Sequence, residues 1–402
     1  MNIMYDPADA DIRRNPFPLY QELQEHDPVH WSDPLKSWIV TRYDDVRTVA
    51  LSKELSPDRL TPFYEASTGE RRELLGEIMR YLNKWLVFRD PPEHTRLRRL
   101  LNTVFTPKAI AAMRPTIAGT VEHILTGIDD SQPIDFIRDF AMLLPGYVIM
   151  DMLAIPRDDF PRIKAWSDDI RLFIGTARGV PNKYQRARDG CINMSDYFRD
   201  VIRQRRANPG DDFVSRMTLA RDEGNALTED ELVATCMLIL FGGHETTTSF
   251  LGNAVKALID HPDQLARLRA SPDLIESAVE ELLRYDGPSN SIARVVAVDH
   301  ELSGSRLKKG DRVFAMLNAA NRDPNAFENP HTLDLARTPN RHLTFGQGSH
   351  FCLGATLARL ESNVALSILT ERYPSMRFAD GDFKWMDALV MRGLTEFPLT
   401  LK

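Results

Sequence analysis

Cysteine is scarce in this chain of 402 residues, which contains only Cys191, Cys236 and Cys352. Three cysteines, odd in number and far apart, exclude a secreted disulfide framework and indicate a reducing compartment. A chain of this length buries enough apolar surface to fold without disulfides or a structural metal. We therefore expect a cytoplasmic protein in which at least one thiol is available for chemistry.

Long apolar runs are also absent. Residues 1–20 contain acidic residues and three prolines instead of a signal peptide, and the most apolar later stretch, residues 140–155, is interrupted by Pro145, Gly146 and Asp151. A membrane-spanning helix needs about 20 consecutive apolar residues. The sequence therefore predicts a soluble protein with no membrane segment.

Basic residues are not in excess, because 50 Lys and Arg stand against 57 Asp and Glu and give a formal net charge of -7. This is the wrong sign for a protein that binds nucleic acid or anionic membranes through its overall charge. Gly/Ser linkers, internal repeats and charge blocks that would divide the chain are missing as well. We expect no nucleic-acid partner and one large domain over residues 1–402.

Helical periodicity dominates what the sequence does contain. Two short β-like segments, residues 28–31 and 38–41, precede a helical pattern that begins at about Tyr43. Between residues 106 and 206, apolar residues recur every three or four positions and prolines interrupt the pattern, which is typical of successive helices. The sequence predicts a mainly α protein with small β-sheets.

The clearest single helix is predicted from Thr228 to about Asp260, where Thr228 and Glu231 form a capping box. A helix of this length is about 48 Å long. Its middle contains Gly242, Gly243 and three consecutive threonines, although each glycine costs about 1 kcal/mol relative to alanine. Such a local conflict with helix propensity usually indicates a functional site.

The strongest signal is the cysteine loop, residues 345–354, which reads Phe-Gly-Gln-Gly-Ser-His-Phe-Cys-Leu-Gly and precedes a helical stretch over residues 355–373. Glycines allow the backbone to approach a flat or bulky group closely. A cysteine just before a helix has amide donors and the positive end of the helix dipole, which hold it as a thiolate that suits metal ligation. The alternative is a glycine-rich turn with an inert buried cysteine.

This loop resembles the heme-binding loop of the cytochrome P-450 family. Three further matches occur in the family's order: a Glu-x-x-Arg pair at Glu281 and Arg284, an oxygen-activating helix centred on residues 242–246, and a helix start at residues 90–98 with a His and an Arg four positions apart. The resemblance extends from about residue 90 to residue 393. It implies a single large domain with heme between a long central helix and the helix that follows the cysteine loop.

The resemblance also implies a heme b cofactor with Cys352 as the ligand of its iron. Four residues match the family's propionate positions, and donors are needed there because buried carboxylates without partners are costly. Glu281 and Arg284 are implied to lock the region behind the heme. The cofactor-binding residues so implied are His94, Arg98, Arg294, Phe345, Gly346, His350, Cys352 and Gly354.

The family's chemistry follows from the thiolate, which favours cleavage of the O–O bond of dioxygen. Glu245 and Thr246 are implied to act as catalytic residues that supply protons, and Gly242 with Gly243 to leave room for dioxygen. The alternative for the pair is an ordinary polar helix face.

Two departures from the family pattern are present. Gly242 stands where alanine is usual. Residues 333–337 keep only Asp334 and Arg337 of the family's aromatic-Asp-Pro-x-Arg pattern, which puts the local packing in doubt.

Most residues that match the distal side of the family's pocket are apolar, which suggests a hydrophobic small-molecule substrate such as a terpenoid, fatty acid, macrolide or aromatic. The alternative is that the apolar helix face simply packs in the hydrophobic core. Ser289, Asn290 and Ser291 are candidates for holding one polar group. The candidate substrate residues are Trp85, Leu86, Leu172, Phe173, Leu238, Phe241, Gly242, Ile292 and Val390.

A flavin domain, a dinucleotide-binding Gly-x-Gly-x-x-Gly motif and an iron–sulfur cysteine cluster are all missing. Electrons are therefore expected from NAD(P)H through a ferredoxin or flavodoxin and its reductase. Arg96, Arg99, Arg341 and Arg359 are candidates for a basic patch that steers such an acidic partner.

The resulting prediction is a bacterial-type monooxygenase of secondary metabolism that inserts one oxygen atom by hydroxylation or epoxidation. The alternatives are a peroxide-driven heme-thiolate peroxygenase, a non-catalytic heme-binding sensor, and a heme-free helical interaction protein.

Overall fold

Helices dominate the computed structural model, which describes residues 3–175, 180–221 and 226–402, and the strands form small sheets. The prediction of a mainly α protein with small β-sheets is confirmed. Within the described ranges, no helix is both long enough and apolar enough to cross a lipid bilayer. The chain forms two compact units, with residues 1–56, 114–144 and 245–402 in the first and residues 57–113 and 145–244 in the second. The assignment of one domain to residues 1–402 stays a prediction.

The larger sheet of the first unit has five strands in the order β1-β2-β8-β5-β3. β2 and β8 are parallel, and the other neighbours are antiparallel. Ile292 pairs with Ala315 and Arg294 pairs with Val313 between β5 and β8. The strands are β1 (Val29–Ser32), β2 (Ser37–Val40), β3 (Leu55–Ser56), β5 (Ser291–Val296) and β8 (Arg312–Met316).

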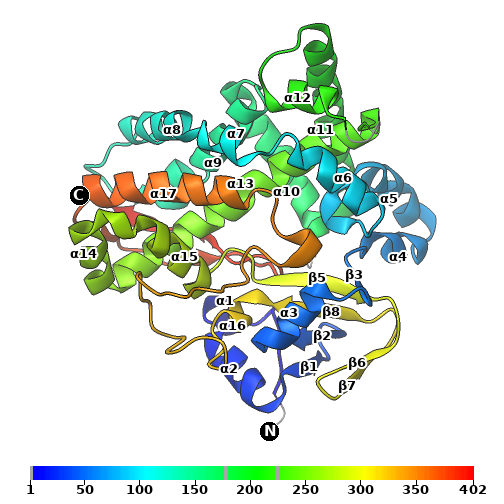
Figure 1. Ribbon diagram of the computed structural model, residues 1–402, viewed down its shortest axis with the longest axis horizontal. Coiled ribbons are helices and arrows are strands. Elements are labelled where there is room, and N and C mark those ends of the chain that lie inside the picture. Colours follow the sequence, from blue (N-terminus) through cyan, green and yellow to red (C-terminus); the bar gives the residue numbers. More distant parts are fainter. Residues whose placement is uncertain (1–2, 176–179, 222–225) are drawn as a thin grey trace. The chain divides into compact units, whose positions relative to one another are not determined.

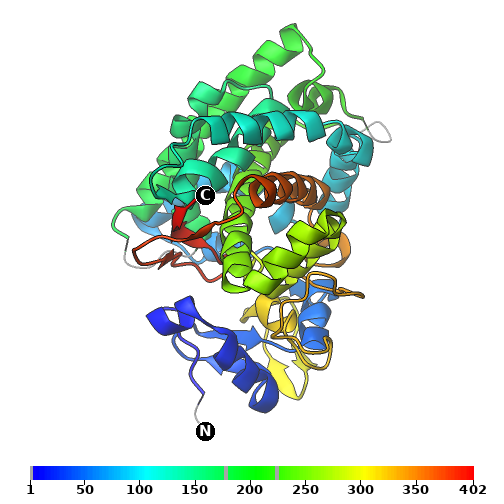
Figure 2. The same ribbon diagram turned by 90° about the vertical axis from the view of Figure 1, so that its left-hand side faces the viewer.

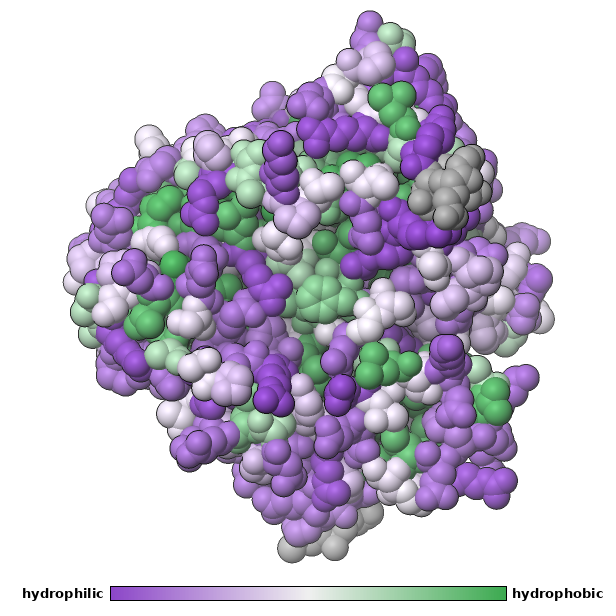
Figure 3. All heavy atoms as spheres, viewed as in Figure 1, coloured by the Kyte–Doolittle hydropathy of each residue, from purple (hydrophilic) through white to green (hydrophobic). Residues whose placement is uncertain are grey.

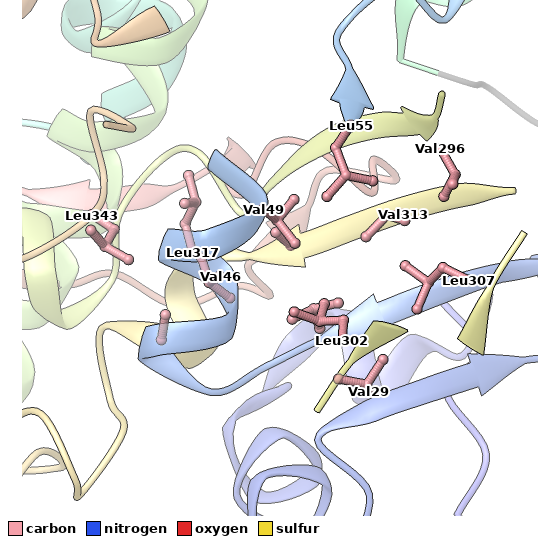
Figure 4. Close-up of a cluster of buried hydrophobic side chains, with 13 residues drawn as sticks. Val29, Val46, Val49, Leu55, Val296, Leu302, Leu307, Val313, Leu317 and Leu343 are labelled. Carbon is pink, nitrogen blue, oxygen red and sulfur yellow. The ribbon is translucent and has the colours of Figure 1, made fainter. Parts of the chain in front are cut away.

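A cluster of branched aliphatic side chains packs on one face of this sheet (Figure 4). Val313 on β8 and Val296 on β5 belong to the same cluster as Val46 and Val49 of α3 (Tyr43–Leu51), and all four are almost fully buried. Burial of each such side chain stabilises the fold by about 1.5–3 kcal/mol. This packing fixes the strand that bears Arg294. The predicted early strands and the helix start at Tyr43 are confirmed.

The remaining strands of the first unit form smaller sheets. α3 and α16 lie beside the five-stranded sheet (Figure 1). The short strands are β4 (Ile134–Asp135), β6 (His300–Leu302), β7 (Ser305–Leu307), β9 (Arg377–Phe378), β10 (Lys384–Trp385), β11 (Leu394–Glu396) and β12 (Pro398–Thr400).

α17 (Ala355–Arg372) packs against α8, α14 and α15 of the first unit. Figure 2 shows α17 in red-brown next to the yellow-green α14 and α15. The other helices of this unit are α1 (Ala10–Arg14), α2 (Phe17–His26), α8 (Arg114–Thr126), α14 (Pro262–Ala270), α15 (Ile275–Tyr285) and α16 (Leu317–Ala320), with a π-helical segment at Ile137–Ala141 and short 3-10 segments at Pro272–Leu274 and Gly348–His350.

The second unit is helical, and its most extensive packing is between α10 and α11. Gly190 permits this close crossing, because a Cβ at that position would lie 2.8 Å from the carbonyl oxygen of Trp166. The helices that lie wholly in this unit are α4 (Leu60–Glu65), α5 (Gly69–Leu82), α6 (Glu93–Asn102), α7 (Pro107–Ala111), α10 (Phe160–Ile174), α11 (Lys183–Ala207) and α12 (Phe213–Leu219), with 3-10 segments at Leu86–Phe88 and Arg157–Asp159. α9 (Leu143–Met152) begins at the last two residues of the first unit and continues in the second. The predicted series of helices between residues 106 and 206 is confirmed.

The long helix α13 (Glu229–Asp260) contributes its first half to the second unit and its second half to the first. Its predicted capping box is confirmed, because the Thr228 amide donates to Glu231 Oε2 at 2.8 Å and the Glu231 amide donates to Thr228 Oγ1 at 3.3 Å. The helix is continuous through its glycines and threonines. The local conflict with helix propensity is therefore tolerated without a break.

Hydrophilic side chains predominate on the face shown in Figure 3, and apolar side chains appear between them in small groups. Singly exposed apolar residues are normal on folded proteins and need no separate explanation.

Candidate functional site

The cysteine loop is closed by backbone hydrogen bonds. The amide of Cys352 donates to the Phe345 carbonyl at 2.9 Å, and the amide of Gly346 donates to the Leu343 carbonyl at 2.7 Å. Gly346 and Gly348 have φ values of 70° and 71°, which residues with a side chain rarely adopt. A Cβ at Gly348 would also lie 2.7 Å from Leu51 Cδ2. Glycine is therefore required at both positions for the loop to hold this shape.

The three thiols differ in exposure. Cys352 is exposed directly before α17, whereas Cys191 and Cys236 are buried in helices. Burial raises the pKa of both the Cys191 and the Cys236 thiol, so these two stay protonated and unreactive. Of the three, the structure presents only Cys352 to a ligand, and the alternative of an inert buried cysteine in the loop is wrong.

Glu281 and Arg284 form a fully buried ion pair on α15. Arg284 Nε lies 2.7 Å from Glu281 Oε2 and Nη2 lies 2.8 Å from Oε1. The remaining donors of Arg284 reach the carbonyl oxygens of Asn321, Pro330 and Thr332 at 2.8–3.1 Å. The pair ties α15 to the segment that leads into the cysteine loop.

The segment over residues 333–337 is well packed despite its departure from the family pattern. Arg337 Nε donates to both oxygens of Glu281 at 3.1 Å, and the amide of Asp334 donates to the same carboxylate at 3.0 Å. Leu333 and Leu335 fill the core at 2% and 0% exposure. The doubt about local packing is removed, and Arg337 is a partner of Glu281 that its retained place in the motif could have indicated.

Two candidate propionate donors lie in the first unit. Arg294 is on β5, which lies between β8 and β3 in the sheet, and is 8% exposed, and its Nη1 donates to the carbonyl of Ala293 at 2.9 Å. His350 ends the short 3-10 segment in the cysteine loop, two residues before Cys352. A nearly buried guanidinium on a rigid strand suits an anionic ligand, because burying either charge alone is costly.

The other two candidate donors, His94 and Arg98, lie in the second unit. They are four residues apart and therefore on one face of α6, and His94 is 1% exposed. Burial and the charge of Arg98 lower the pKa of His94 below its usual range, although Asp90 acts in the opposite direction. The ring of His94 carries an N–H in either protonation state, so it can donate to an anionic group.

Glu245 and Thr246 follow each other in the second half of α13. Glu245 is 7% exposed and Thr246 is half-buried. In the first half of the helix, the side of Gly242 where a Cβ would be built faces open space, but a Cβ at Gly243 would lie 2.5 Å from Ile149 Cδ1 on α9. The expectation that both glycines leave room for dioxygen is therefore wrong for Gly243, which serves helix packing.

His244 lies between these residues and is a buried polar side chain that the sequence did not single out. It is 1% exposed, and its Nδ1 lies 2.6 Å from the Leu240 carbonyl, one helical turn earlier. This contact places the ring proton on Nδ1. Histidine at this position adds a side-chain hydrogen bond to the helix backbone in the middle of the motif.

The candidate substrate residues fall into two groups. In the second unit, Trp85 is 1% exposed and packs on Phe241 with ring centroids 5.2 Å apart. Leu86 is buried, and Phe173 and Leu238 are half-buried. In the first unit, the half-buried Ile292 and Val390 pack against two separate core clusters. Whether any of these residues contacts a substrate stays a prediction.

The proposed basic patch is weaker than its sequence suggests. Arg96 forms an ion pair with Glu231, and Arg359 forms a bidentate ion pair with Glu280 at 2.6 and 2.8 Å. At distances well beyond the pair, where an approaching partner protein is steered, the charge of a cation that is held by a carboxylate is largely cancelled. The other two members, Arg99 and Arg341, are exposed. Half of the predicted patch is therefore neutralised by carboxylates of the same chain.

These residues fit a heme group. Cys352 presents a thiol at a helix N-terminus, and Arg294 supplies a nearly buried cation. The glycines around Cys352 have no side chains, so a flat group can approach the backbone of the loop closely. Cys352, His350, Arg294, Glu245 and Thr246 belong to the first unit. Gly242, His94 and Arg98 belong to the second. Each unit thus presents part of the predicted set.

Comparison with known proteins agrees with this chemistry. The family model for cytochrome P-450 matches residues 64–382. The biotin biosynthesis cytochrome P-450 of Bacillus subtilis (strain 168) is 35% identical over 404 residues and covers 100% of both chains. The polyketide biosynthesis cytochrome P-450 PksS of the same organism is 33% identical and covers 99% of both.

A solved structure supports the same conclusion for the fold. The crystal structure of P450BioI in complex with hexadec-9Z-enoic acid ligated acyl carrier protein has a TM-score of 0.90 and 34% sequence identity, and it covers 98% of this chain and 99% of that chain. The chain therefore belongs to the cytochrome P-450 family of heme b monooxygenases.

Proposed function

We propose that this monooxygenase inserts one oxygen atom of dioxygen into a hydrophobic small molecule, by hydroxylation or epoxidation, with Cys352 as the ligand of the heme iron. The observation that supports it most is the exposed thiol of Cys352 before α17, in a chain whose other thiols are buried. When bound, the heme supplies the iron at which dioxygen is activated, and a thiolate ligand favours cleavage of the O–O bond.

The protein's own residues hold the cofactor and exclude water. His94, Arg98, Arg294 and His350 bind the two propionates, since these four supply N–H donors on elements that fix them. Phe345, Gly346 and Gly354 shape the cysteine loop against the porphyrin. Glu281 and Arg284 hold the loop region in place.

Glu245 and Thr246 would supply the protons that the cofactor's reaction with dioxygen needs. The Thr246 hydroxyl is the final donor, and the adjacent Glu245 carboxyl exchanges protons with water. Gly242 leaves the space next to this turn open. An apolar surrounding makes a positioned donor necessary, because bulk water cannot supply the proton there.

Replacing Thr246 with alanine is expected to uncouple the reaction. Consumption of NAD(P)H and dioxygen continues, but hydrogen peroxide is released in place of product, because the donor hydroxyl is lost. A positioned acid or base contributes about 10²–10⁴-fold, so product per dioxygen should fall at least about tenfold. The measurement compares dioxygen uptake, peroxide and product. Thr248→Ala, on the same helix but two residues on, is the control, and normal coupling in Thr246→Ala would remove Thr246 from proton delivery.

The substrate we propose to test first is a long-chain acyl group, free or attached to a carrier protein. The half-buried Phe173, Leu238 and Ile292 are apolar, and the similar P450BioI was crystallised with a hexadecenoyl-charged carrier protein. Terpenoids, macrolides and aromatics are the other classes.

Titration of the ferric protein with hexadecenoic acid, its carrier-protein conjugate, a terpenoid and a macrolide, followed by the heme absorption band, is the experiment that separates these classes. We expect the acyl compounds to shift the band at the lowest concentrations. A shift with the terpenoid or macrolide alone would contradict the acyl proposal.

The electron donors we propose are a ferredoxin or flavodoxin and its NAD(P)H reductase, in the cytoplasm. Substrate-dependent NAD(P)H consumption with these partners supports a monooxygenase. Product formation with hydrogen peroxide alone would indicate a peroxygenase, and heme uptake without NAD(P)H consumption under any substrate would indicate a sensor.

A further inference from the structure

A second acidic residue of α15 lies beside the Glu281–Arg284 pair and contacts the helix that follows the cysteine loop. Glu280 accepts hydrogen bonds from Arg359 of α17, with Nε to Oε1 at 2.6 Å and Nη2 to Oε2 at 2.8 Å. The two side chains are 29% and 33% exposed. A bidentate pair with this degree of burial is geometrically defined and incompletely screened by solvent.

His342 is the second partner of Glu280 and is almost buried. Its Nε2 lies 3.1 Å from Glu280 Oε2, and its Nδ1 accepts from the Thr344 amide at 3.3 Å. The ring proton is therefore on Nε2 and is donated to the carboxylate. Thr344 Oγ1 in turn donates to the Leu283 carbonyl of α15 at 2.7 Å. The segment entering the cysteine loop is thus fixed to α15 by Glu280 as well as by Glu281.

Arg359 also contacts the cysteine loop itself. Its guanidinium carbon lies 4.4 Å from the centre of the Phe345 ring, which is a cation–π distance. The carbonyl of the same Phe345 accepts the hydrogen bond from the Cys352 amide at 2.9 Å. Phe345 therefore contacts the Arg359 guanidinium through its ring and the Cys352 amide through its carbonyl.

The charges of this cluster are permanent near neutral pH. Burial acts to raise the pKa of Glu280, but the hydrogen bonds from Arg359 and His342 and the charge of Arg359 outweigh it and hold the pKa below its usual range. Arg359 is the fifth residue of α17, about 6 Å along the axis from the helix start. The contact with the Phe345 ring, at 4.4 Å, places the guanidinium against the cysteine loop at less than the Debye length of about 8 Å at physiological ionic strength.

We propose that Arg359 and Glu280 are positioning residues that set the electrostatic environment of the Cys352 thiolate, with Phe345 as the contact between the ion pair and the loop. This inference rests on the proposed role of Cys352 as the ligand of the heme iron. It assigns Arg359 to the support of the cysteine loop, where the sequence had suggested a docking residue for a redox partner.

The test is the reduction potential of the heme in Arg359→Gln, Glu280→Gln and the double variant. Reduction adds one negative charge at the heme, so loss of the cation is expected to lower the potential and loss of the carboxylate to raise it. The double variant should lie between the two. If Arg359 and Glu280 had only a structural role, both single variants would lose thermal stability, but their reduction potentials would not shift in opposite directions.

Arg157 supplies a matched control in the other unit. Its Nε donates to Asp151 Oδ1 at 3.0 Å in a bidentate pair, its guanidinium lies 5.1 Å from the Tyr147 ring, and the two charged side chains are 31% and 27% exposed. Arg157→Gln should lose a similar amount of stability and leave the potential unchanged. Arg359→Lys, which keeps the charge but not the forked geometry, should restore the potential in part.

The two proposals fail in different ways. If the parent protein lacks the thiolate-type absorption band in its reduced carbon monoxide complex, the assignment of Cys352 is wrong. If the parent has the band, but the two single variants shift the potential in the same direction or no further than Arg157→Gln, the inference about Arg359 and Glu280 alone is overturned.

Discussion

Cys352→Ala is expected to abolish oxygen insertion while the protein still folds. The side chain is exposed, so its removal leaves no cavity, and the backbone hydrogen bond from residue 352 to Phe345 does not need the thiol. In the heme-free chain, substitutions at such exposed positions usually change the free energy of unfolding by no more than about 0.5 kcal/mol. The heme-loaded variant also loses the stabilisation that the iron–sulfur bond supplies. The reduced carbon monoxide complex of the variant should lack the red-shifted thiolate band that the parent shows, and product formation should fall to background.

The other two cysteines provide the controls. Cys191→Ala and Cys236→Ala remove buried thiols, so they should cost roughly 1 kcal/mol of stability. Both should keep the thiolate band and the activity. A thiolate band that survives in Cys352→Ala, or disappears in Cys191→Ala, would show that the iron ligand has been assigned to the wrong cysteine.

The features that were predictable from the sequence are those encoded by neighbouring residues. The capping box of α13 depends on two residues three positions apart, and the cysteine loop depends on ten consecutive residues whose glycines require positive φ. Glu281 and Arg284 are three positions apart, which is about one helical turn. In each case the spacing along the chain already fixes the geometry.

The features that were not predictable depend on residues distant in the sequence. Gly242 and Gly243 are adjacent and chemically identical, but only the folded chain brings Ile149 against the second one. Arg359 meets Glu280 across 79 positions of the chain, which turns an apparent surface cation into one half of an ion pair. Local spacing contains no information about such partners.

The same distinction applies to histidine charge. Burial and the neighbouring charge of Arg98 lower the pKa of His94 in this chain. The sequence gives the distance between His94 and Arg98 along α6, but not how far the ring is removed from water. A donor role for His94 agrees with both the sequence and the structure.

Loss of Arg284 is expected to have the largest effect on stability. Its guanidinium is fully buried and donates to Glu281 and to three backbone carbonyls, so Arg284→Leu leaves the Glu281 carboxylate with fewer partners and three carbonyls with lost bonds. Removing one partner of a buried ion pair costs about 3–5 kcal/mol. Denaturant unfolding followed by circular dichroism measures this loss.

Arg284→Lys separates charge from geometry. A lysine keeps the positive charge but cannot reach the carboxylate and three carbonyls at once, so it should lose nearly as much stability as Arg284→Leu. Arg267→Ala, which breaks an exposed pair with Asp334 at 2.9 Å, should cost no more than about 1 kcal/mol. If Arg284→Lys were as stable as the parent, charge alone would hold α15 to the segment before the cysteine loop. The forked hydrogen bonds would then be unnecessary for placing Cys352.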